Sequence, residues 1–435
     1  MAPLIVIVGR PNVGKSTLFN RLSRSRDALV DNRPGITRDR LYAPITYEGA
    51  SLTLVDTGGF DDISQDPLLE RVRYQVEAAI MEADGIIFMV DARQGVTPGD
   101  EEMAHILRKS QKKIFLAANK IDGPEHENSA HDFYKFGLEP VYPVSAAHGY
   151  GIRSLMRDMV RDLPISKPVE YSDGQIRVAI LGRPNVGKSS LINRILGLER
   201  VVVSEHPGTT RDTVDTPFSH GGKEYLLIDT AGIRKKAKVK EKIDKFSMIK
   251  ALKSLDRCHI ATILLDASQG VSEQDARICG YAFEQGRGVV LAINKWDLVK
   301  GDARRQARLN NSMDRQLKFM PFAPRVNLSA LTGERVMKLF GKIDPLYEQF
   351  SRAISTASIN RALQEIVRRH PPPRIGRSRL KFSYATQTRT KPPTFVVFVN
   401  KPNAIHFSYE RFLVNQLRSH LRLELTPIRL RFRKK

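Results

Sequence analysis

The stretch GRPNVGKS occupies residues 9–16, and the same eight letters return unchanged at residues 182–189. Each copy follows a short apolar run, LIVIV or RVAIL, and precedes a segment with the apolar spacing of a helix. A glycine-rich loop between a strand and a helix is the setting in which G-x-x-x-x-G-K-S binds phosphate. The loop N–H groups and the helix N-terminus both favour negative charge there. The sequence therefore predicts two phosphate-binding loops.

Each residue of the two octets has an expected place at the phosphates. The lysines should reach the β- and γ-phosphates, and the serines after them should bind Mg²⁺. The phosphate-binding residues are expected to be Gly9, Arg10, Pro11, Asn12, Val13, Gly14, Lys15 and Ser16, and Gly182, Arg183, Pro184, Asn185, Val186, Gly187, Lys188 and Ser189.

Two further motifs recur at the same spacing. PGITRD (34–39) matches PGTTRD (207–212), and DTGG (56–59) matches DTAG (229–232). An aspartate at the end of a strand is placed to hold Mg²⁺ directly or through water, and the glycine after it can donate its N–H to the γ-phosphate. The predicted switch and γ-phosphate residues are Thr37, Asp56, Thr57, Gly58, Gly59, Phe60, Thr210, Asp229, Thr230, Ala231, Gly232 and Ile233. The predicted Mg²⁺ ligands are Ser16, Thr37 and Asp56 in the first copy, and Ser189, Thr210 and Asp229 in the second.

The base is indicated by NKID (119–122) and NKWD (294–297), each after an apolar strand-like run. Guanine offers a ring N–H and an exocyclic amine that one carboxylate can accept together, whereas adenine has no such pair of donors. Adenine would leave the carboxylate unpaired, at a cost of about 1–3 kcal/mol or more. SAAHG (145–149) and SALTG (329–333) complete the set. The guanine-binding residues are expected to be Asn119, Lys120, Asp122, Ser145 and Ala146, and Asn294, Lys295, Asp297, Ser329 and Ala330.

Five motifs in the same order, twice, predict that a whole GTP-binding domain is duplicated. Strands that alternate with helices, with a phosphate loop after the first strand, predict an α/β fold with a doubly wound, mostly parallel sheet in each copy. The expected domains are residues 1–163 and 176–350, joined by a linker at 164–175 and followed by a basic third domain at 351–435.

Charge separates the parts of the chain. Residues 1–163 carry 20 Lys and Arg against 23 Asp and Glu, whereas residues 351–435 carry 19 against 3. A segment this basic favours a polyanionic partner, with nucleic acid as the leading candidate and a solubilising surface as the alternative. Cys258 and Cys279 are the only cysteines, so a disulfide framework is not expected. The absence of a membrane-length apolar run or a signal-peptide pattern favours a cytoplasmic protein.

Two complete GTPase domains followed by a basic domain resemble the EngA/Der family of bacterial ribosome-assembly GTPases. The resemblance covers the whole chain and implies a third domain of KH-like fold and a role in maturing the large (50S) ribosomal subunit. It also implies ribosomal RNA as a partner, with no membrane involved. A monomer is the default expectation.

The third domain can also be interpreted directly. PTFVVFVN (393–400) and LTPIRLRFRKK (425–435) alternate as strands do, and the second places Arg429, Arg431 and Arg433 on one face. Gly376 is the only glycine after residue 350, so the G-x-x-G loop with which a KH domain clamps RNA is absent. Either the domain contacts RNA through its charge, or it packs on the GTPase domains instead.

The hydrolytic machinery departs from that of many small GTPases. Phe60 and Ile233 stand where a glutamine often orients the attacking water, and neither side chain can hydrogen-bond water. Asn12 and Asn185 resemble the loop asparagine of potassium-dependent GTPases, so we expect K⁺ to supply positive charge beside the phosphates. The alternative is that each asparagine only stabilises its loop.

The two copies differ after the N-K-x-D motif. Asn119 and Ser145 are 26 residues apart, and Asn294 and Ser329 are 35 apart; the added length predicts an arginine-rich helix near residues 300–319. The segment after the second D-x-x-G, RKKAKVKEKIDK, is also basic, and reversing the charge of Lys235, Lys236 and Lys238 should weaken RNA association. The function that fits best is a GTP-hydrolysing switch in ribosome biogenesis. The alternative is a GTP/GDP-sensing RNA-binding checkpoint protein in which hydrolysis is incidental.

Overall fold

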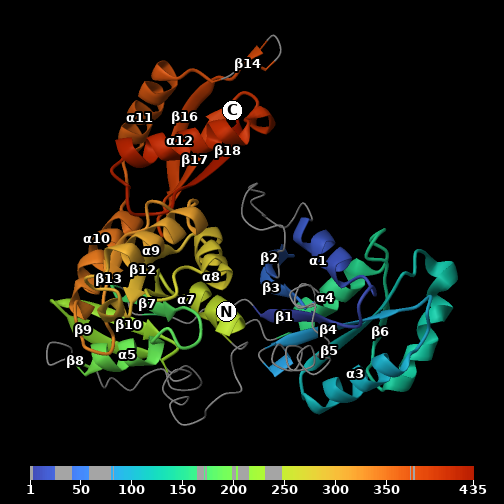
Figure 1. Ribbon diagram of the computed structural model, residues 1–435. Helices are drawn as coiled ribbons and strands as arrows, with labels where there is room; N and C mark the ends of the chain where they lie inside the picture. The colour runs from blue at the N-terminus through green and yellow to red at the C-terminus, as the bar shows by residue number, and fades with distance from the viewer. Residues whose placement is uncertain are drawn as a thin grey trace. The chain divides into compact units, whose positions relative to one another are not determined.

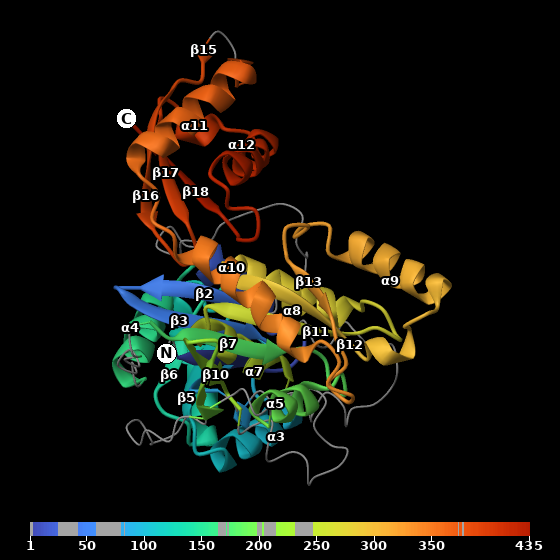
Figure 2. The same ribbon diagram turned by 90° about the vertical axis from the view of Figure 1, so that its left-hand side faces the viewer.

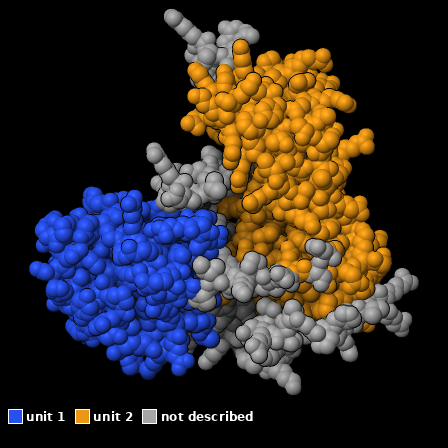
Figure 3. Space-filling model, turned by 180° about the vertical axis from the view of Figure 1, so that it is seen from behind, with its two compact units in different colours: residues 1–170 blue, residues 171–435 orange. Residues whose placement is uncertain are grey.

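The computed structural model describes residues 3–24, 42–57, 80–81, 83–163, 171, 174–197, 202–203, 215–230, 247–372, 374–375 and 378–435. The chain forms two compact units, residues 1–170 and residues 171–435 (Figure 3). The second unit holds both the second GTPase domain and the C-terminal domain. The domain boundaries expected from the sequence remain a prediction.

The first unit is built on a six-stranded sheet in the order β2-β3-β1-β4-β5-β6. Among the strands of its described residues, only β2 runs antiparallel to its neighbour, and the other pairs are parallel. Every residue of β1 and β4 is buried, as expected for parallel strands that are covered on both faces. The strands are β1 (Leu4–Val8), β2 (Tyr42–Tyr47), β3 (Ala50–Asp56), β4 (Gly85–Asp91), β5 (Lys113–Asn119) and β6 (Val141–Pro143).

Helices cover this sheet (Figure 1). One apolar cluster joins α1 and α4 to the sheet, and it includes Leu18 and Phe19 of α1 with Leu155, Met156 and Met159 of α4. The helices are α1 (Lys15–Arg24), α3 (Pro98–Lys109), the 3₁₀ segment η2 (Pro124–Phe136) and α4 (Ile152–Asp162). Because the strands are parallel, their carboxyl ends meet at one edge, where the loops carrying the sequence motifs emerge.

The second GTPase domain repeats this arrangement with seven strands in the order β13-β12-β11-β7-β10-β9-β8. The pairs from β13 to β10 are parallel, and β9 is antiparallel to both β8 and β10. The strands are β7 (Ile176–Leu181), β8 (Val202–Val203), β9 (Thr216–His220), β10 (Lys223–Ile228), β11 (Ile260–Asp266), β12 (Gly288–Asn294) and β13 (Arg325–Asn327). The helices are α5 (Lys188–Leu196), α7 (Ser247–Arg257), α8 (Glu273–Glu284), η4 (Trp296–Leu298), α9 (Ala303–Gln316), η5 (Val336–Leu339) and α10 (Phe340–Ser351).

The C-terminal domain is a three-stranded sheet, β16-β17-β18, with α11 and α12 packed on one face (Figure 2). Its elements are α11 (Thr356–Arg369), β14 (Arg374–Ile375), β15 (Ser378–Arg379), β16 (Phe382–Arg389), β17 (Thr394–Val399), η6 (Pro402–Ala404), α12 (Phe407–His420) and β18 (Arg429–Lys434). Alternation in residues 393–400 would bury one face of the strand, but most of both faces of β17 is buried. Phe395, Val397 and Val399 are buried on one face, and Thr394 and Val396 are buried as well, because β17 is the central strand.

The C-terminal domain also contacts the second GTPase domain. Arg429 donates a hydrogen bond from its guanidinium to the carbonyl of Glu284, at the end of α8. The backbone N–H of Lys391 donates to the Phe350 carbonyl at 2.9 Å, and the guanidinium of Arg418 lies 4.3 Å from the ring centre of Phe322. The packing alternative is therefore realised for Arg429, while Arg431 and Arg433 are exposed.

The described part of the chain contains no helix that combines the length and the apolarity needed to span a membrane. Cys258 and Cys279 are both buried and unbridged, and burial raises the pKa of the Cys258 thiol to about 11.

Candidate nucleotide-binding sites

Each phosphate loop connects the first parallel strand of its domain to the following helix. Gly14 and Gly187 adopt positive φ values of 104° and 98°. A side chain at either position would place its Cβ atom 2.3 Å from the amide nitrogen of Asn119 or Asn294. Glycine is therefore required at the end of both loops for conformational and steric reasons.

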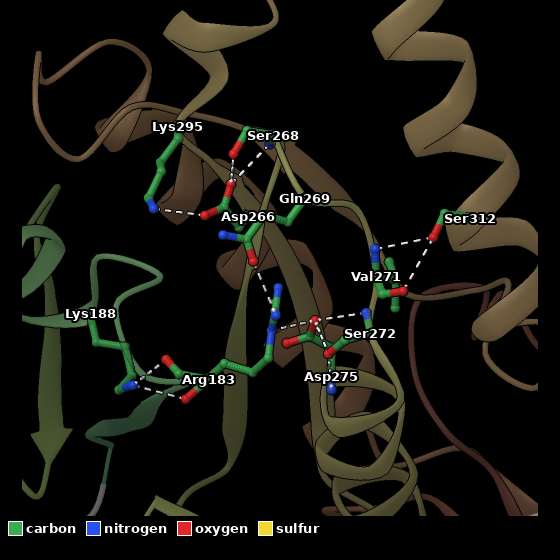
Figure 4. A network of polar contacts seen from close by, with 11 residues as sticks. Arg183, Lys188, Asp266, Ser268, Gln269, Val271, Ser272, Asp275, Lys295 and Ser312 are labelled. Atoms are coloured by element: carbon green, nitrogen blue, oxygen red, sulfur yellow. Dashed lines mark hydrogen bonds and ion pairs between the residues drawn. The ribbon is translucent and has the colours of Figure 1, made fainter. Parts of the chain in front are cut away.

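The loop lysines turn back over their own loops. The Nζ of Lys15 donates to the carbonyls of Gly9 and Arg10, each at 2.9 Å, and Lys188 donates to Gly182 and Arg183 at 2.8 and 2.6 Å (Figure 4). The ammonium group is therefore held by two carbonyls at the start of the ring that the loop forms. Such a ring concentrates donors and positive charge where a phosphate would sit.

A buried asparagine joins the phosphate loop to the base loop in both domains. The amide nitrogen of Asn119 donates to the Val13 carbonyl at 2.7 Å, and its oxygen accepts from the Ala146 N–H at 2.8 Å. Asn294 makes the same two contacts, to Val186 at 2.6 Å and to Ala330 at 2.8 Å. The sequence motifs thus come together as one structure in each domain.

The lysine of each N-K-x-D motif is held by an aspartate that the sequence analysis did not identify. The Nζ of Lys120 lies 2.5 Å from Asp91, and that of Lys295 lies 2.7 Å from Asp266. Both carboxylates are buried at the ends of their strands. Burial opposes ionisation of Asp266, but hydrogen bonds from Lys295 and Ser268 outweigh it and lower its pKa. These ion pairs fix the lysine stems beside the base-reading loops.

The two carboxylates predicted to read guanine have different surroundings. Asp122 accepts hydrogen bonds from Ser145 Oγ and from the Arg93 guanidinium, each at 2.7 Å. The Ser145 hydrogen bond is the larger cause of a lowered pKa for Asp122, although burial opposes it. Within the described residues, one carboxylate oxygen of Asp297 is buried and has no hydrogen-bond partner. A ligand that brings an N–H donor to this position would satisfy that oxygen.

The arginine of each octet has a structural contact that was not expected. Arg10 and Arg183 pair with Asp100 and Asp275 at 2.8 Å, and both carboxylates are fully buried at the starts of α3 and α8. Each aspartate also accepts from the Thr97 or Ser272 side chain in a capping box. The arginine side chains therefore anchor the two phosphate loops to the starts of α3 and α8.

The switch segments are described only at their beginnings. Asp56 ends β3 in register with Ile7, and Thr57 Oγ1 donates to the Ile7 carbonyl at 2.7 Å. In the second domain the strand ends one residue earlier, at Ile228, and Asp229 has a left-handed φ of 58°. The switch residues outside the described part of the chain are Thr37, Gly58, Gly59, Phe60, Thr210, Ala231, Gly232, Ile233, Lys235, Lys236 and Lys238.

Comparisons with known proteins agree with this arrangement. A family model described as a 50S ribosome-binding GTPase matches residues 4–120 and again residues 177–295. A model of the KH-domain-like C-terminal region of EngA bacterial GTPase enzymes matches residues 353–433. A GTPase Der from Syntrophotalea carbinolica is 48% identical over 431 residues, covering 99% of this chain and 98% of that protein. One from Syntrophobacter fumaroxidans is 49% identical over 435 residues, with the same coverage.

Two solved structures match part of this chain. An Era variant from Aquifex aeolicus bound to GDP and aluminium fluoride matches 60% of this chain and 92% of its own, at 21% identity and a TM-score of 0.30. The G domain of the T. maritima FeoB iron transporter matches 39% of this chain and 98% of its own, at 26% identity and a TM-score of 0.27. Scores this low support no conclusion about this chain. The full-length relatives and the matched models do: this chain belongs to the EngA/Der family of GTPases, with two GTPase domains and a KH-like C-terminal domain.

Proposed function

We propose that this GTPase acts in ribosome biogenesis, in maturation of the 50S subunit, through nucleotide-dependent binding to ribosomal RNA. Support comes from the matched 50S ribosome-binding GTPase model and from the 19 Lys and Arg against 3 Asp and Glu in residues 351–435. Such a charge favours a polyanion. The proposal includes a cytoplasmic location, where ribosomes assemble, and a monomeric chain.

The observation that carries the nucleotide part of the proposal is the buried amide of Asn119 and of Asn294. Each amide bonds the phosphate loop with one end and the base loop with the other. A molecule with a phosphate group at one end and a base at the other fits that connection. In the proposed complex, Asp122 and Asp297 accept two N–H groups of guanine, and Lys15 and Lys188 contact the β- and γ-phosphates.

The residues of both loops suit Mg²⁺. Ser16 and Ser189 lie in the first turn of α1 and α5. Asp56 is the last residue of β3, and Asp229 directly follows β10. Hydroxyl and carboxylate oxygens are the ligands that Mg²⁺ takes together with phosphates. When bound, Mg²⁺ would neutralise negative charge on the phosphates. The role of the chain is to place these oxygens, while the loop N–H groups hold the phosphates in line for attack by water.

Potassium is the proposed further cation. Asn12 and Asn185 are exposed and have left-handed φ values of 65° and 60°, a conformation that asparagine tolerates better than most residues. This backbone requirement gives the asparagine a conformational role with or without an ion. Comparing phosphate release in potassium chloride and in sodium chloride tests the proposal, and equal turnover in both salts would contradict it.

Sedimentation with purified ribosomal subunits tests the proposed partner. The chain should sediment with 50S subunits in the presence of a non-hydrolysable GTP analogue, less with GDP, and not with 30S subunits. Sedimentation that is independent of nucleotide, or equal with both subunits, would contradict the proposal. Phosphate release by Lys15→Ala and Lys188→Ala, measured in parallel, shows whether hydrolysis at each site accompanies binding.

A further inference from the structure

A groove in the second GTPase domain has a strongly basic lining and no role in the sites described above. Its volume is about 390 Å³, within the range of about 300–1,000 Å³ typical of ligand sites. We call it the α9 groove. It is lined by Ile293, Asn310, Met313, Arg325, Val326, Asn327, Arg335, Lys338 and Lys342.

One wall of the α9 groove is α9, the helix formed by the longer segment of the second domain (Figure 2). Leu309 and Met313 are buried against the domain, and Asp302 caps the helix by accepting from the Arg305 N–H. Ser312 Oγ donates to the Val271 carbonyl at 3.3 Å and accepts from its N–H at 3.1 Å (Figure 4). The wall is therefore fixed to the loop after β11.

Few acidic side chains neutralise this lining. Asp314 pairs with Arg325 at 2.9 Å, and Glu334 lies 2.9 Å from Lys300 and 3.7 Å from Arg335. Among the described residues, no carboxylate lies within ion-pairing distance of Lys338 or Lys342, and both lysines are exposed. The groove thus holds an excess of positive charge that faces solvent.

The first GTPase domain lacks this charge at the same places in the fold. Counting from Ser145 and Ser329, the counterparts of Arg335, Lys338 and Lys342 are Gly151, Ser154 and Asp158. Val141 of β6 pairs with Leu116 of β5, and Arg325 of β13 pairs with Leu291 of β12. The two leucines occupy the same position in their strands, so Val141 is the counterpart of Arg325. All four cations are therefore particular to the second domain.

Arg335 is in addition held in an unfavourable backbone conformation. Its φ is +59°, and its counterpart Gly151 has a φ of +67°. Glycine adopts this region without a steric penalty, whereas another residue costs on the order of 1 kcal/mol. The second domain thus carries an arginine where glycine would be the more stable choice, and strained residues of this kind concentrate at functional sites.

We infer that the α9 groove binds the phosphate backbone of RNA. Four cations with the amide groups of Asn310 and Asn327 supply donors for phosphate and ribose oxygens, and the lining has no aromatic side chain on which a base could stack. Binding should therefore be independent of base sequence. The groove also adjoins the N-K-x-D and S-A-L motifs of the second domain, because Ile293 directly precedes NKWD (294–297) and Asn327 lies two residues before SALTG (329–333). This inference rests on the proposed RNA-binding function and assigns a surface to it.

The test compares two full-length triple variants. Arg335→Gly, Lys338→Ser and Lys342→Gln remove three groove cations, two of them by the first domain's own residues, so folding should be preserved. Arg108→Gln, Lys109→Gln and Arg153→Gln remove three exposed cations of the first domain and serve as the matched control. The probe is a fluorescein-labelled oligo(U) of about 30 nucleotides, titrated over a range of KCl concentrations.

For single strands, the logarithm of the binding constant falls with the logarithm of the salt concentration with a slope of about 0.7 per phosphate contact. The loss of three contacts should therefore make this slope smaller by about 2. Affinity at about 0.1 M salt should fall on the order of 100-fold, while GDP affinity at both sites is unchanged. The control variant should behave as the native chain does. An unchanged slope in the groove variant, or an equal loss in the control, would overturn the inference.

Two further arms separate other anions from RNA. Binding of inorganic phosphate at millimolar concentration by a native chain that does not bind oligo(U) would identify a small-anion site and overturn the assignment to RNA. Polyglutamate that binds as tightly as oligo(U), with the same loss in the groove variant, would indicate an acidic protein surface instead. If the native chain binds oligo(U) through the groove but fails to sediment with 50S subunits, the ribosomal proposal fails and the groove assignment stands.

Discussion

Replacing Asn294 with alanine removes the side chain that joins the phosphate loop to the base loop of the second site. Its amide is 2% exposed, donates to Val186 O at 2.6 Å and accepts from Ala330 N at 2.8 Å. Truncation leaves two buried backbone groups without partners, at about 1–3 kcal/mol each. The total cost is therefore about 2–6 kcal/mol, reduced where water can enter the space left by the amide.

This cost should appear in nucleotide affinity. In the proposed complex the nucleotide contacts both loops, so binding must restore the arrangement that the amide maintains in the native chain. At about 1.4 kcal/mol per tenfold change, a loss of about 3 kcal/mol weakens binding on the order of 100-fold. The exposed Asn193 on α5 provides the matched control, because Asn193→Ala removes the same group from a solvent-facing helical position.

The assay can address the second site alone. Trp296 is the only tryptophan of the chain and lies within the second N-K-x-D motif. Energy transfer from Trp296 to methylanthraniloyl-GDP therefore reports binding at that site, and urea unfolding shows whether the variant is folded. Native affinity in a folded Asn294→Ala chain, or an equal loss in Asn193→Ala, would refute the reasoning.

Three further predictions follow from buried groups. Burial, with Arg177 nearby, lowers the pKa of His259 to about 3, below the unfolded value of about 6.5. Between these two pKa values the unfolded chain binds a proton that the folded chain does not, so the free energy of unfolding falls as the pH drops below 6.5. Between pH 7 and pH 5, the free energy of unfolding measured in urea should therefore fall by about 2 kcal/mol less in His259→Gln than in the native chain. Equal losses in both chains would contradict this sign. Arg183→Met should destabilise the second domain by about 3–5 kcal/mol, because it leaves the buried Asp275 carboxylate unpaired, and an unchanged urea midpoint would show that the pair contributes nothing. Gly14→Ala should weaken GDP binding at the first site at least about tenfold by displacing Asn119, and native affinity in equilibrium dialysis would rule out the steric argument.

The duplicated motifs were predictable because ligand chemistry dictates their residue types over a few consecutive positions. The phosphate loops with Lys15 and Lys188, and the presence of Asn119 and Asn294 at the predicted base site, follow from such local patterns. The link that these asparagines make between the two loops is seen only in the structure. The fold class follows from the same order of strands and helices, and the structure and the family models confirm it.

The partners of these residues were not predictable in the same way. Asp91 and Asp266 are single aspartates at the ends of apolar runs, and their link to Lys120 and Lys295 arises only from the parallel register of adjacent strands. Their one sequence signal is that they recur at the same place in both copies. Arg429 likewise belongs to an alternating strand by sequence, and only tertiary packing brings it to Glu284.

The most direct test of the account is the number and kind of nucleotides that one chain binds. Equilibrium dialysis of the full-length protein should find two GDP molecules per chain, reduced to one by Asp122→Ala or by Asp297→Ala, and ATP in excess should displace neither. A single GDP per native chain, or displacement by ATP at a similar concentration, would contradict two guanine-specific sites.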